Sequence, residues 1–153
     1  MEITALQLAQ RFVGIKEIPG KDENDPFVMS MLRLDNDWPK NDETPWCSGF
    51  VNYIAWLLRL PRSKSLRARS WLNVGVGTME TLSPGFDVVI LSRGQNPEPV
   101  NVINAPGHVG FYAGELTDHM PNNIPLLGGN QGDAVCVREY PRERVLGVRR
   151  LLL

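Results

Sequence analysis

Cys47 occupies a position at which a thiol could act as a nucleophile. It follows Thr44 and Pro45 and precedes the apolar segment FVNYIAWLL. Thr44 suits a helix N-cap and proline suits the first helical position, so the pattern predicts a helix from Pro45 to about Leu58 with Cys47 in its first turn. Backbone N–H groups there lack intrahelical partners, and together with the helix dipole they stabilise a thiolate and lower its pKa. The alternative is that Cys47 is a small buried hydrophobic residue.

A nucleophilic thiol needs a base, and the chain has two histidines. His119 lies in the polar segment LTDHMPNN, which is typical of a solvated turn. His108 opens the segment HVGFY, in which His108, Gly110 and Tyr112 share one face of the predicted strand. A histidine at the start of a strand can lie over the N-terminus of a helix that packs on the same sheet. His108 is therefore the candidate base.

A third polar residue is expected on a neighbouring strand, where it would hold the imidazole by its other nitrogen. The segment IPLLGGNQGDAV offers Asn130 and Gln131 directly after an apolar run. Only one of them can face His108 if the strand is regular, and the two preceding glycines could carry a bulge that exchanges them. Asn130 is the prediction and Gln131 the alternative. The competing interpretation is that GGNQGD is only a hairpin turn.

Helices that could position these residues are predicted in the first half of the chain. Thr4 and Gln7 form a capping box for an amphipathic helix over about 4–14. Asp25 can cap a second helix that has Pro26 at its first position. The segment LRARSWLNVG indicates a shorter helix.

Strands are predicted in the second half, where short β-branched segments are bounded by Gly, Pro and Asn. They cover residues 86–92, 108–114, 124–129, 134–140 and 144–150. Helices followed by strands in one chain of 153 residues indicate a single α+β domain, with N-terminal helices packed on a mostly antiparallel sheet of about five strands. The irregular insert 93–107 is long enough to be a functional rim or a lid.

Composition excludes several classes of protein. The net charge is −1, which argues against a nucleic-acid-binding protein, because phosphate binding usually needs a clustered basic surface. A local basic patch is nevertheless predicted, either as a solvated face or as a site for an anionic partner, from Arg59, Arg62, Lys64, Arg67 and Arg69. Two distant cysteines form neither a metal-binding pattern nor a disulfide framework, so we expect no metal and no cofactor.

Five segments in this order carry a family resemblance: PWCSGFVNY, RSWLNVG, GFDVVILSR, GHVGFYAG and LLGGNQGDAV. They resemble the CHAP and NlpC/P60 superfamily of papain-like cysteine peptidases, and most closely a small phage and bacterial CHAP-like subgroup. The resemblance implies a papain-like fold in which Cys47 is the nucleophile, His108 the base and Asn130 the orienting residue. It also implies a peptidoglycan hydrolase, an amidase or endopeptidase that cleaves amide bonds of the cell-wall peptide. Many relatives have an acidic residue where this chain has Gly128, which leaves the third role less certain.

In such a mechanism the Cys47 thiolate attacks the carbonyl, and the oxyanion lies at the helix N-terminus. The second oxyanion donor is unassigned; the candidates are Asn41, Trp46 and Gln131. Aromatic side chains could wall the substrate groove, and each is equally compatible with a place in the core. The predicted substrate-binding residues are Trp46, Gln131, Tyr112 and Trp38.

The opening segment MEITALQLAQRFVG lacks the basic start and continuous apolar run of a signal peptide, and no segment has the length of a membrane span. We therefore expect synthesis in the cytoplasm and action on the cell wall, in the periplasm, after release or injection. A phage endolysin and a secreted antibacterial effector are both compatible with this route. The expected state is a monomer, with an immunity protein as partner if the protein is an effector.

Two other functions use the same residues differently. An acyltransferase or deamidase would share the acyl-enzyme step, and new free amines from wall fragments would distinguish hydrolysis from it. A non-catalytic binding module of the same fold would not need a reactive thiol. Alkylation of Cys47 near neutral pH would distinguish an enzyme from such a module.

Replacement of Cys47 by Ala or Ser is expected to abolish peptidoglycan hydrolysis and to leave the fold intact, because only the nucleophile is removed. Loss of turbidity of a wall suspension measures the activity, and circular dichroism checks the fold. Cys136, which alternates with Val135 and Val137 on a predicted strand, is the internal control: Cys136→Ala should cost some stability at most. Lysis by Cys47→Ala at the parent rate would exclude the thiol mechanism.

Overall fold

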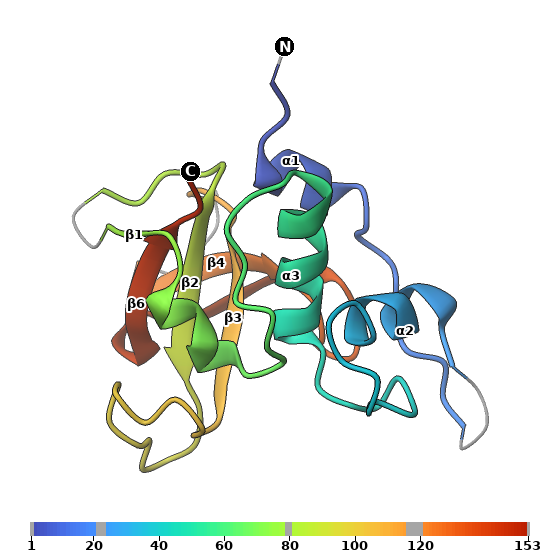
Figure 1. The fold of residues 1–153 in the computed structure, drawn as a ribbon. Helices are drawn as coiled ribbons and strands as arrows, with labels where there is room; N and C mark the ends of the chain where they lie inside the picture. The colour runs from blue at the N-terminus through green and yellow to red at the C-terminus, as the bar shows by residue number, and fades with distance from the viewer. Residues whose placement is uncertain (1, 21–23, 79–80, 116–120, 153) are drawn as a thin grey trace.

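The computed structural model describes residues 2–20, 24–78, 81–115 and 121–152. Over these ranges the chain has an α+β fold in which helices pack on a six-stranded antiparallel sheet (Figure 1). The helices are α1 (Ala5–Gln10), α2 (Pro26–Leu32) and α3 (Cys47–Leu57), with two short 3-10 helices, η1 (Ala68–Asn73) and η2 (Arg142–Arg144). Among the described residues, no helix combines the length and hydropathy that crossing a bilayer requires.

All five predicted strands are confirmed, and the structure adds a two-residue edge strand. The strands are β1 (Val76–Gly77), β2 (Asp87–Ser92), β3 (Gly107–Tyr112), β4 (Asn123–Gly128), β5 (Cys136–Pro141) and β6 (Val145–Arg150). Their order in the sheet is β1-β6-β2-β3-β4-β5, and every neighbouring pair is antiparallel. The coarse α+β class predicted from the sequence is therefore confirmed.

The caps of the first two helices follow the sequence pattern. The Thr4 side chain accepts from the Gln7 N–H and the Gln7 side chain accepts from the Thr4 N–H, so the predicted capping box is confirmed. Asp25 caps α2 through the N–H groups of Phe27 and Val28. The predicted shorter helix is the 3-10 helix η1.

The start of α3 differs from the prediction by two residues. The helix begins at Cys47, and its N-cap is Trp46, with φ −125° and no side-chain cap. Thr44 is not the cap, because Thr44 belongs to a preceding turn in which its N–H donates to the Asn41 carbonyl. The fully buried Trp46 side chain anchors the chain where the helix begins. Cys47 is thus confirmed in the first turn of the helix.

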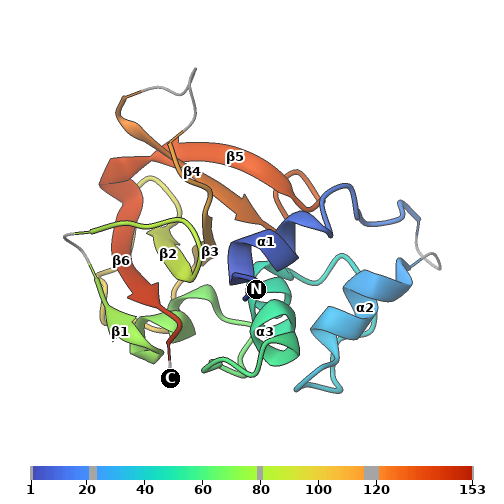
Figure 2. The ribbon, with the colours of Figure 1, turned by 90° about the horizontal axis from the view of Figure 1, so that it is seen from above.

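Residue alternation in the strands produces two apolar layers. On the helix side of the sheet, Val109 and Phe111 of β3 belong to the main core, together with Phe50 and Ile54 of α3. The opposite face buries a second cluster that includes Leu91, Tyr112 and Leu126. Seen from above, the helices lie on one side of a curved sheet whose edges are formed by β5 and by β1 (Figure 2).

A buried polar network attaches α3 to the segment that follows it. The Ser48 hydroxyl donates to the Ser65 carbonyl at 2.6 Å and accepts from Trp71 Nε1 at 2.9 Å. Asn52, one helical turn after Ser48, also donates to the Ser65 carbonyl. Because buried polar groups are costly when unpaired, this network fixes η1 against the N-terminal half of α3. It accounts for Ser48 and Asn52 in PWCSGFVNY and for Trp71 in RSWLNVG.

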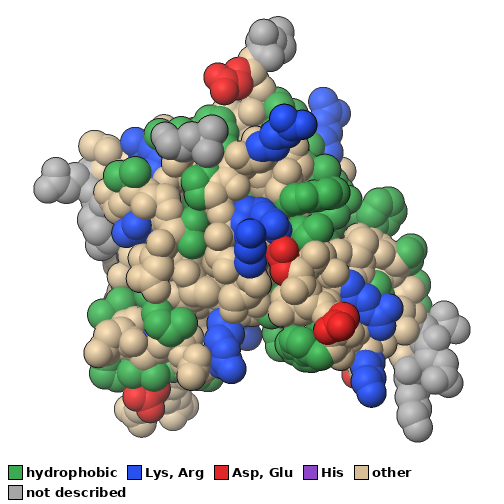
Figure 3. Space-filling model, in the orientation of Figure 1, with side chains coloured by type: hydrophobic (Ala, Val, Ile, Leu, Met, Phe, Trp, Pro, Cys, Tyr) green, Lys and Arg blue, Asp and Glu red, His purple; other side chains and the backbone are tan. Residues whose placement is uncertain are grey.

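Arg69 is fully buried and attaches η1 to the insert 93–107. Its guanidinium donates to three backbone carbonyls, of Pro106 (3.2 Å), Glu98 (3.1 Å) and Pro99 (2.6 Å). The predicted basic patch is therefore not a uniform surface, because Arg69 lies inside the fold. On the face drawn in Figure 3, Lys and Arg side chains are spread among apolar and neutral groups.

Arg69→Lys is expected to lower the free energy of unfolding by about 2 kcal/mol, because an ammonium group cannot reach all three carbonyls and its charge stays buried. Urea denaturation measures the loss. The matched control is Arg67→Lys, since Arg67 is exposed and makes one long bond, at 3.3 Å, to the Asn104 carbonyl. Equal effects of the two replacements would contradict the proposed role of Arg69 in holding the insert.

Candidate active site

The residues predicted to do chemistry gather at one end of the sheet. The start of α3, the end of β2 and the start of β3 all lie in the lower half of the molecule in Figure 1, away from both termini. Cys47 is the first residue of α3, and His108 is the second residue of β3. The β3–β4 pairing covers only Phe111 and Tyr112, so the first residues of β3 have backbone groups available for other partners. One such group is the backbone N–H of Val109, which acts on the nearby Cys47 thiol and lowers its pKa.

His108 is held by Gln131. The His108 side chain is 1% exposed, and its Nε2 lies 2.9 Å from Gln131 Oε1. The Gln131 amide nitrogen donates to the Leu126 carbonyl at 3.2 Å and to the Cys136 carbonyl at 2.6 Å. Both amide protons are thereby used, so Oε1 must be the atom that faces the ring. Nε2 consequently carries the ring proton, and Nδ1 keeps its lone pair when the imidazole is neutral.

Asn130 is not placed against His108. The backbone of Asn130 has φ 56°, in the left-handed region, and β4 ends two residues earlier, at Gly128. The regular strand assumed for Asn130 therefore stops before reaching it, and the turn directs Gln131 inward, where it is 2% exposed. Of the two residues that the sequence left as alternatives, the structure brings Gln131 to the imidazole. The interpretation of GGNQGD as only a turn is incomplete, since the turn also presents this side chain.

Two glycines make room for this arrangement. A Cβ at Gly128 would lie 2.7 Å from Gln131 Oε1, and one at Gly129 would lie 2.7 Å from the Trp46 ring. Both distances are far below ordinary van der Waals contact, so side chains at these positions would displace the amide or the indole. The absence of an acidic residue at position 128 thus has a structural reason: that space is occupied by Gln131.

The Cys47 thiol is enclosed, with 5% of the residue exposed. Burial raises the pKa of the thiol, and this outweighs the lowering effects of the Val109 N–H, of Arg93 and of the first-turn N–H groups. The lowered thiol pKa expected from the helix N-terminus is therefore wrong for this state, because the helix start is covered. In the described part of the chain, His108 bonds to Arg93, Gln131 and Tyr140, and no hydrogen bond joins it to Cys47.

Arg93 and Tyr140 are the site residues that the sequence analysis missed. Arg93 Nη2 lies 3.4 Å from His108 Nδ1, and the Tyr140 hydroxyl lies 3.4 Å from His108 Nε2. The Tyr140 ring also packs on the imidazole, with centroids 5.2 Å apart and planes inclined by 36°. Arg93 was detectable as the first charged residue after the buried strand VVILS, whereas Tyr140 carried no signal beyond its place on a strand.

These surroundings keep His108 neutral. Burial, opposed by the Gln131 bond and assisted by the Arg93 charge, lowers the pKa of His108 from 6.5 to about 4. Burial likewise raises the pKa of Tyr140 to about 12, so its hydroxyl stays protonated. In the free protein the site therefore holds a neutral thiol and a neutral imidazole, and not a preformed thiolate–imidazolium pair.

Most of the predicted substrate-binding residues have other roles. Trp46 is fully buried and donates from Nε1 to Glu17 Oε1 at 2.7 Å, so it neither lines a groove nor offers a free donor. Tyr112 is 4% exposed in the second core, where its hydroxyl donates to Glu115. The amide of Gln131 is fully used. The side chains of Trp46 and Gln131 are therefore excluded as second oxyanion donors, and the third candidate, Asn41, is exposed.

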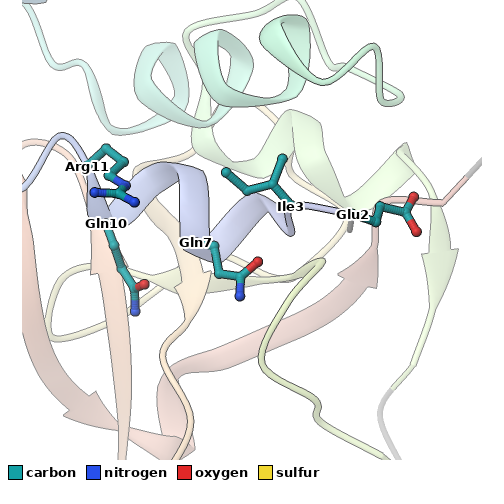
Figure 4. Close-up of a pocket in the computed structure, with 5 residues that line it drawn as sticks. All are labelled: Glu2, Ile3, Gln7, Gln10 and Arg11. Atoms are coloured by element: carbon teal, nitrogen blue, oxygen red, sulfur yellow. The ribbon is translucent and has the colours of Figure 1, made fainter.

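Of the four predicted substrate-binding residues, only Trp38 is exposed to solvent, as a residue that lines a groove must be. It is 60% exposed and lines a groove of about 450 Å³ that also includes Thr44 and Pro45, the latter two positions before Cys47. A second groove, of about 560 Å³, lies beside α1 and is lined by Glu2, Ile3, Gln7, Gln10 and Arg11 (Figure 4). It contains neither a thiol nor an imidazole, so we assign no chemistry to it.

The other histidine and the other cysteine of the chain are His119 and Cys136. His119 lies outside the described residues. The Cys136 thiol donates to the Gln131 carbonyl at 3.2 Å, and the Cys136 carbonyl accepts from the Gln131 side chain. Cys136 thus supports Gln131 through its backbone, which Cys136→Ala would retain.

Gln131→Ala is expected to let the His108 ring proton move between Nε2 and Nδ1, because no other described side chain lies as close to Nε2. Imidazole ¹⁵N chemical shifts should show a nearly pure Nε2–H tautomer in the parent protein and a mixture of tautomers in Gln131→Ala. Asn130→Ala is the matched control and should leave the tautomer unchanged. A tautomer that responds to Asn130→Ala and not to Gln131→Ala would contradict this geometry.

Comparison with known proteins does not identify the chain. No protein-family model matches it, and a search of curated proteins finds no significant match.

Proposed function

We propose that the protein is a cysteine-dependent peptidoglycan hydrolase of papain-like fold, an amidase or endopeptidase acting on the cell-wall peptide. The observation that carries the proposal is that an enclosed thiol and an enclosed imidazole lie at the same end of the sheet. The thiol is at the first position of α3, and the Val109 N–H acts on it by lowering its pKa. The residue before Val109 is His108, whose imidazole proton is fixed on Nε2. The five ordered motifs resemble a superfamily that hydrolyses peptidoglycan, and this resemblance is the reason for proposing the cell wall as the substrate.

In this mechanism, His108 acts as a general base during the attack. Because thiol and imidazole are both neutral, the Cys47 proton moves to Nδ1 as sulfur bonds to the amide carbon. The imidazolium then gives that proton to the leaving amine, which breaks the C–N bond and leaves a thioester. Water, deprotonated by His108, hydrolyses the thioester and regenerates the thiol. Gln131 holds the ring throughout and remains neutral.

Charge on the tetrahedral oxygen develops at the start of α3. The backbone N–H groups of Cys47 and Ser48 lie in the first turn beside the sulfur, and they are the proposed donors to the carbonyl oxygen of a bound substrate. A direct thiol–imidazole bond is absent in the free state, and such bonds commonly tighten only when substrate is bound. Trp38 and the groove beside Pro45 offer a place for the peptide.

Mass spectrometry of digested peptidoglycan tests the proposal. The purified protein should release fragments with a new amine and a new carboxyl group at one type of amide bond, and Cys47→Ala should release none. Cys136→Ser is the matched thiol control and should retain the activity. Unaltered walls after treatment with the folded parent protein would refute the proposed function, and fragments with intact peptides would refute the proposed bond type.

Hydrolysis should continue to an unusually low pH, because His108 stays in its neutral, basic form there. A base must be neutral, and His108, with its pKa lowered to about 4, is neutral at every pH above that value. The acidic limb of kcat/KM on a soluble wall peptide should therefore lie near pH 4. An ordinary histidine would place it near pH 6.5.

A stability control accompanies that profile. Neutral His108 favours the folded state, so its contribution is complete above pH 6.5 and is lost as pH falls toward 4. Circular dichroism at each pH separates loss of fold from loss of the base. An acidic limb near pH 6.5 in folded protein would contradict the assignment of a buried, neutral base.

A further inference from the structure

Arg93 is a cation at the site that has no acidic partner among the residues the structure describes. It is exposed at the end of β2, with Nη2 3.4 Å from His108 Nδ1. Its charge also acts on Cys47 and on Tyr140. No Asp or Glu of the described residues forms an ion pair with Arg93, although acidic partners at 2.6–3.1 Å are present for Arg62, Arg142 and Arg150.

An arginine in this setting is suited to bind an anion from outside the chain. A guanidinium presents a planar set of donors that matches a carboxylate and binds it through two parallel bonds. The contact with Nδ1 is long and uses only one nitrogen of the guanidinium, so donors remain available. A neighbouring imidazole is also a poor permanent partner for a cation, since it brings no negative charge. The uncompensated charge therefore acts on the neighbouring thiol and imidazole.

We propose that Arg93 is a specificity-determining residue that binds a carboxylate of the substrate beside the scissile amide. The substrate class is accordingly a peptide with a free acid next to the bond that is cut, and this identification of the peptide rests on the proposed function. The bound carboxylate neutralises Arg93 and draws the guanidinium away from Nδ1. The lone pair that accepts the Cys47 proton is then free only when an acidic substrate is in place.

Alkylation of Cys47 tests the anion site without any wall substrate. Iodoacetate and iodoacetamide both form an S–C bond with loss of iodide, and they differ in charge. The ratio of their rates cancels any change in the thiol pKa, because both reagents need the same thiolate. Arg93→Gln should lower the iodoacetate-to-iodoacetamide ratio about tenfold. Arg93→Lys should retain most of it, and the remote, exposed Arg11→Gln should change it less than twofold. An unchanged ratio in folded Arg93→Gln would overturn the proposal.

Paired substrates test the same residue during hydrolysis. One wall peptide carries the free carboxylate beside the scissile bond, and the other carries the amide at that position. The parent protein should prefer the acid by about tenfold or more in kcat/KM, and Arg93→Gln should lose this preference. A preference that survives in Arg93→Gln would overturn the proposal. Failure of every variant to cleave either peptide, with the alkylation ratio still dependent on Arg93, would reject the hydrolase and retain the anion site.

Discussion

The hydrogen bonds of the Gln131 amide determine how the site is assembled. One side chain accepts from His108 on β3 and donates to the carbonyls of Leu126 on β4 and Cys136 on β5. It therefore joins three strands at the point where the regular β3–β4 pairing has ended. Because every polar atom of the amide is used in a buried position, the group cannot turn over without leaving donors or acceptors unpaired. That constraint sets the tautomer of His108, and the tautomer decides which ring nitrogen can take a proton.

Burial gives this site a different electrostatic character from that of a preformed ion pair. The thiol pKa is raised and the imidazole pKa is lowered, both chiefly because the charged forms lose water. The backbone N–H groups and Arg93 act in the opposite direction on the sulfur. A substrate that binds here would meet neutral groups poised for a coupled proton transfer. Because the thiol stays protonated when no substrate is bound, it is also less reactive toward alkylating and oxidising agents.

The sequence predicted what depends on local pattern, and it failed where tertiary packing decides. The five strands and the caps at Thr4 and Asp25 follow from periodicity and side-chain chemistry. The helix containing Cys47 was predicted, but its first residue depends on the burial of Trp46, which no local signal gave. The choice of Gln131 over Asn130 depends on a left-handed residue after two tightly packed glycines. The pKa direction of Cys47 depends on what covers the helix start, which is a property of the whole fold.

Covalent catalysis by Cys47, as proposed, can be tested directly, because it passes through an acyl-enzyme that can be detected. A single turnover on a soluble wall peptide, stopped by rapid acid quench, can be followed by mass spectrometry of the protein. We expect a transient mass increase equal to the acyl portion of the peptide, mapped to Cys47 as a thioester, that decays as the free acid is released. Release of the acid at the parent rate with no adduct on Cys47 at any time, or with the adduct on Cys136, would contradict covalent catalysis by Cys47.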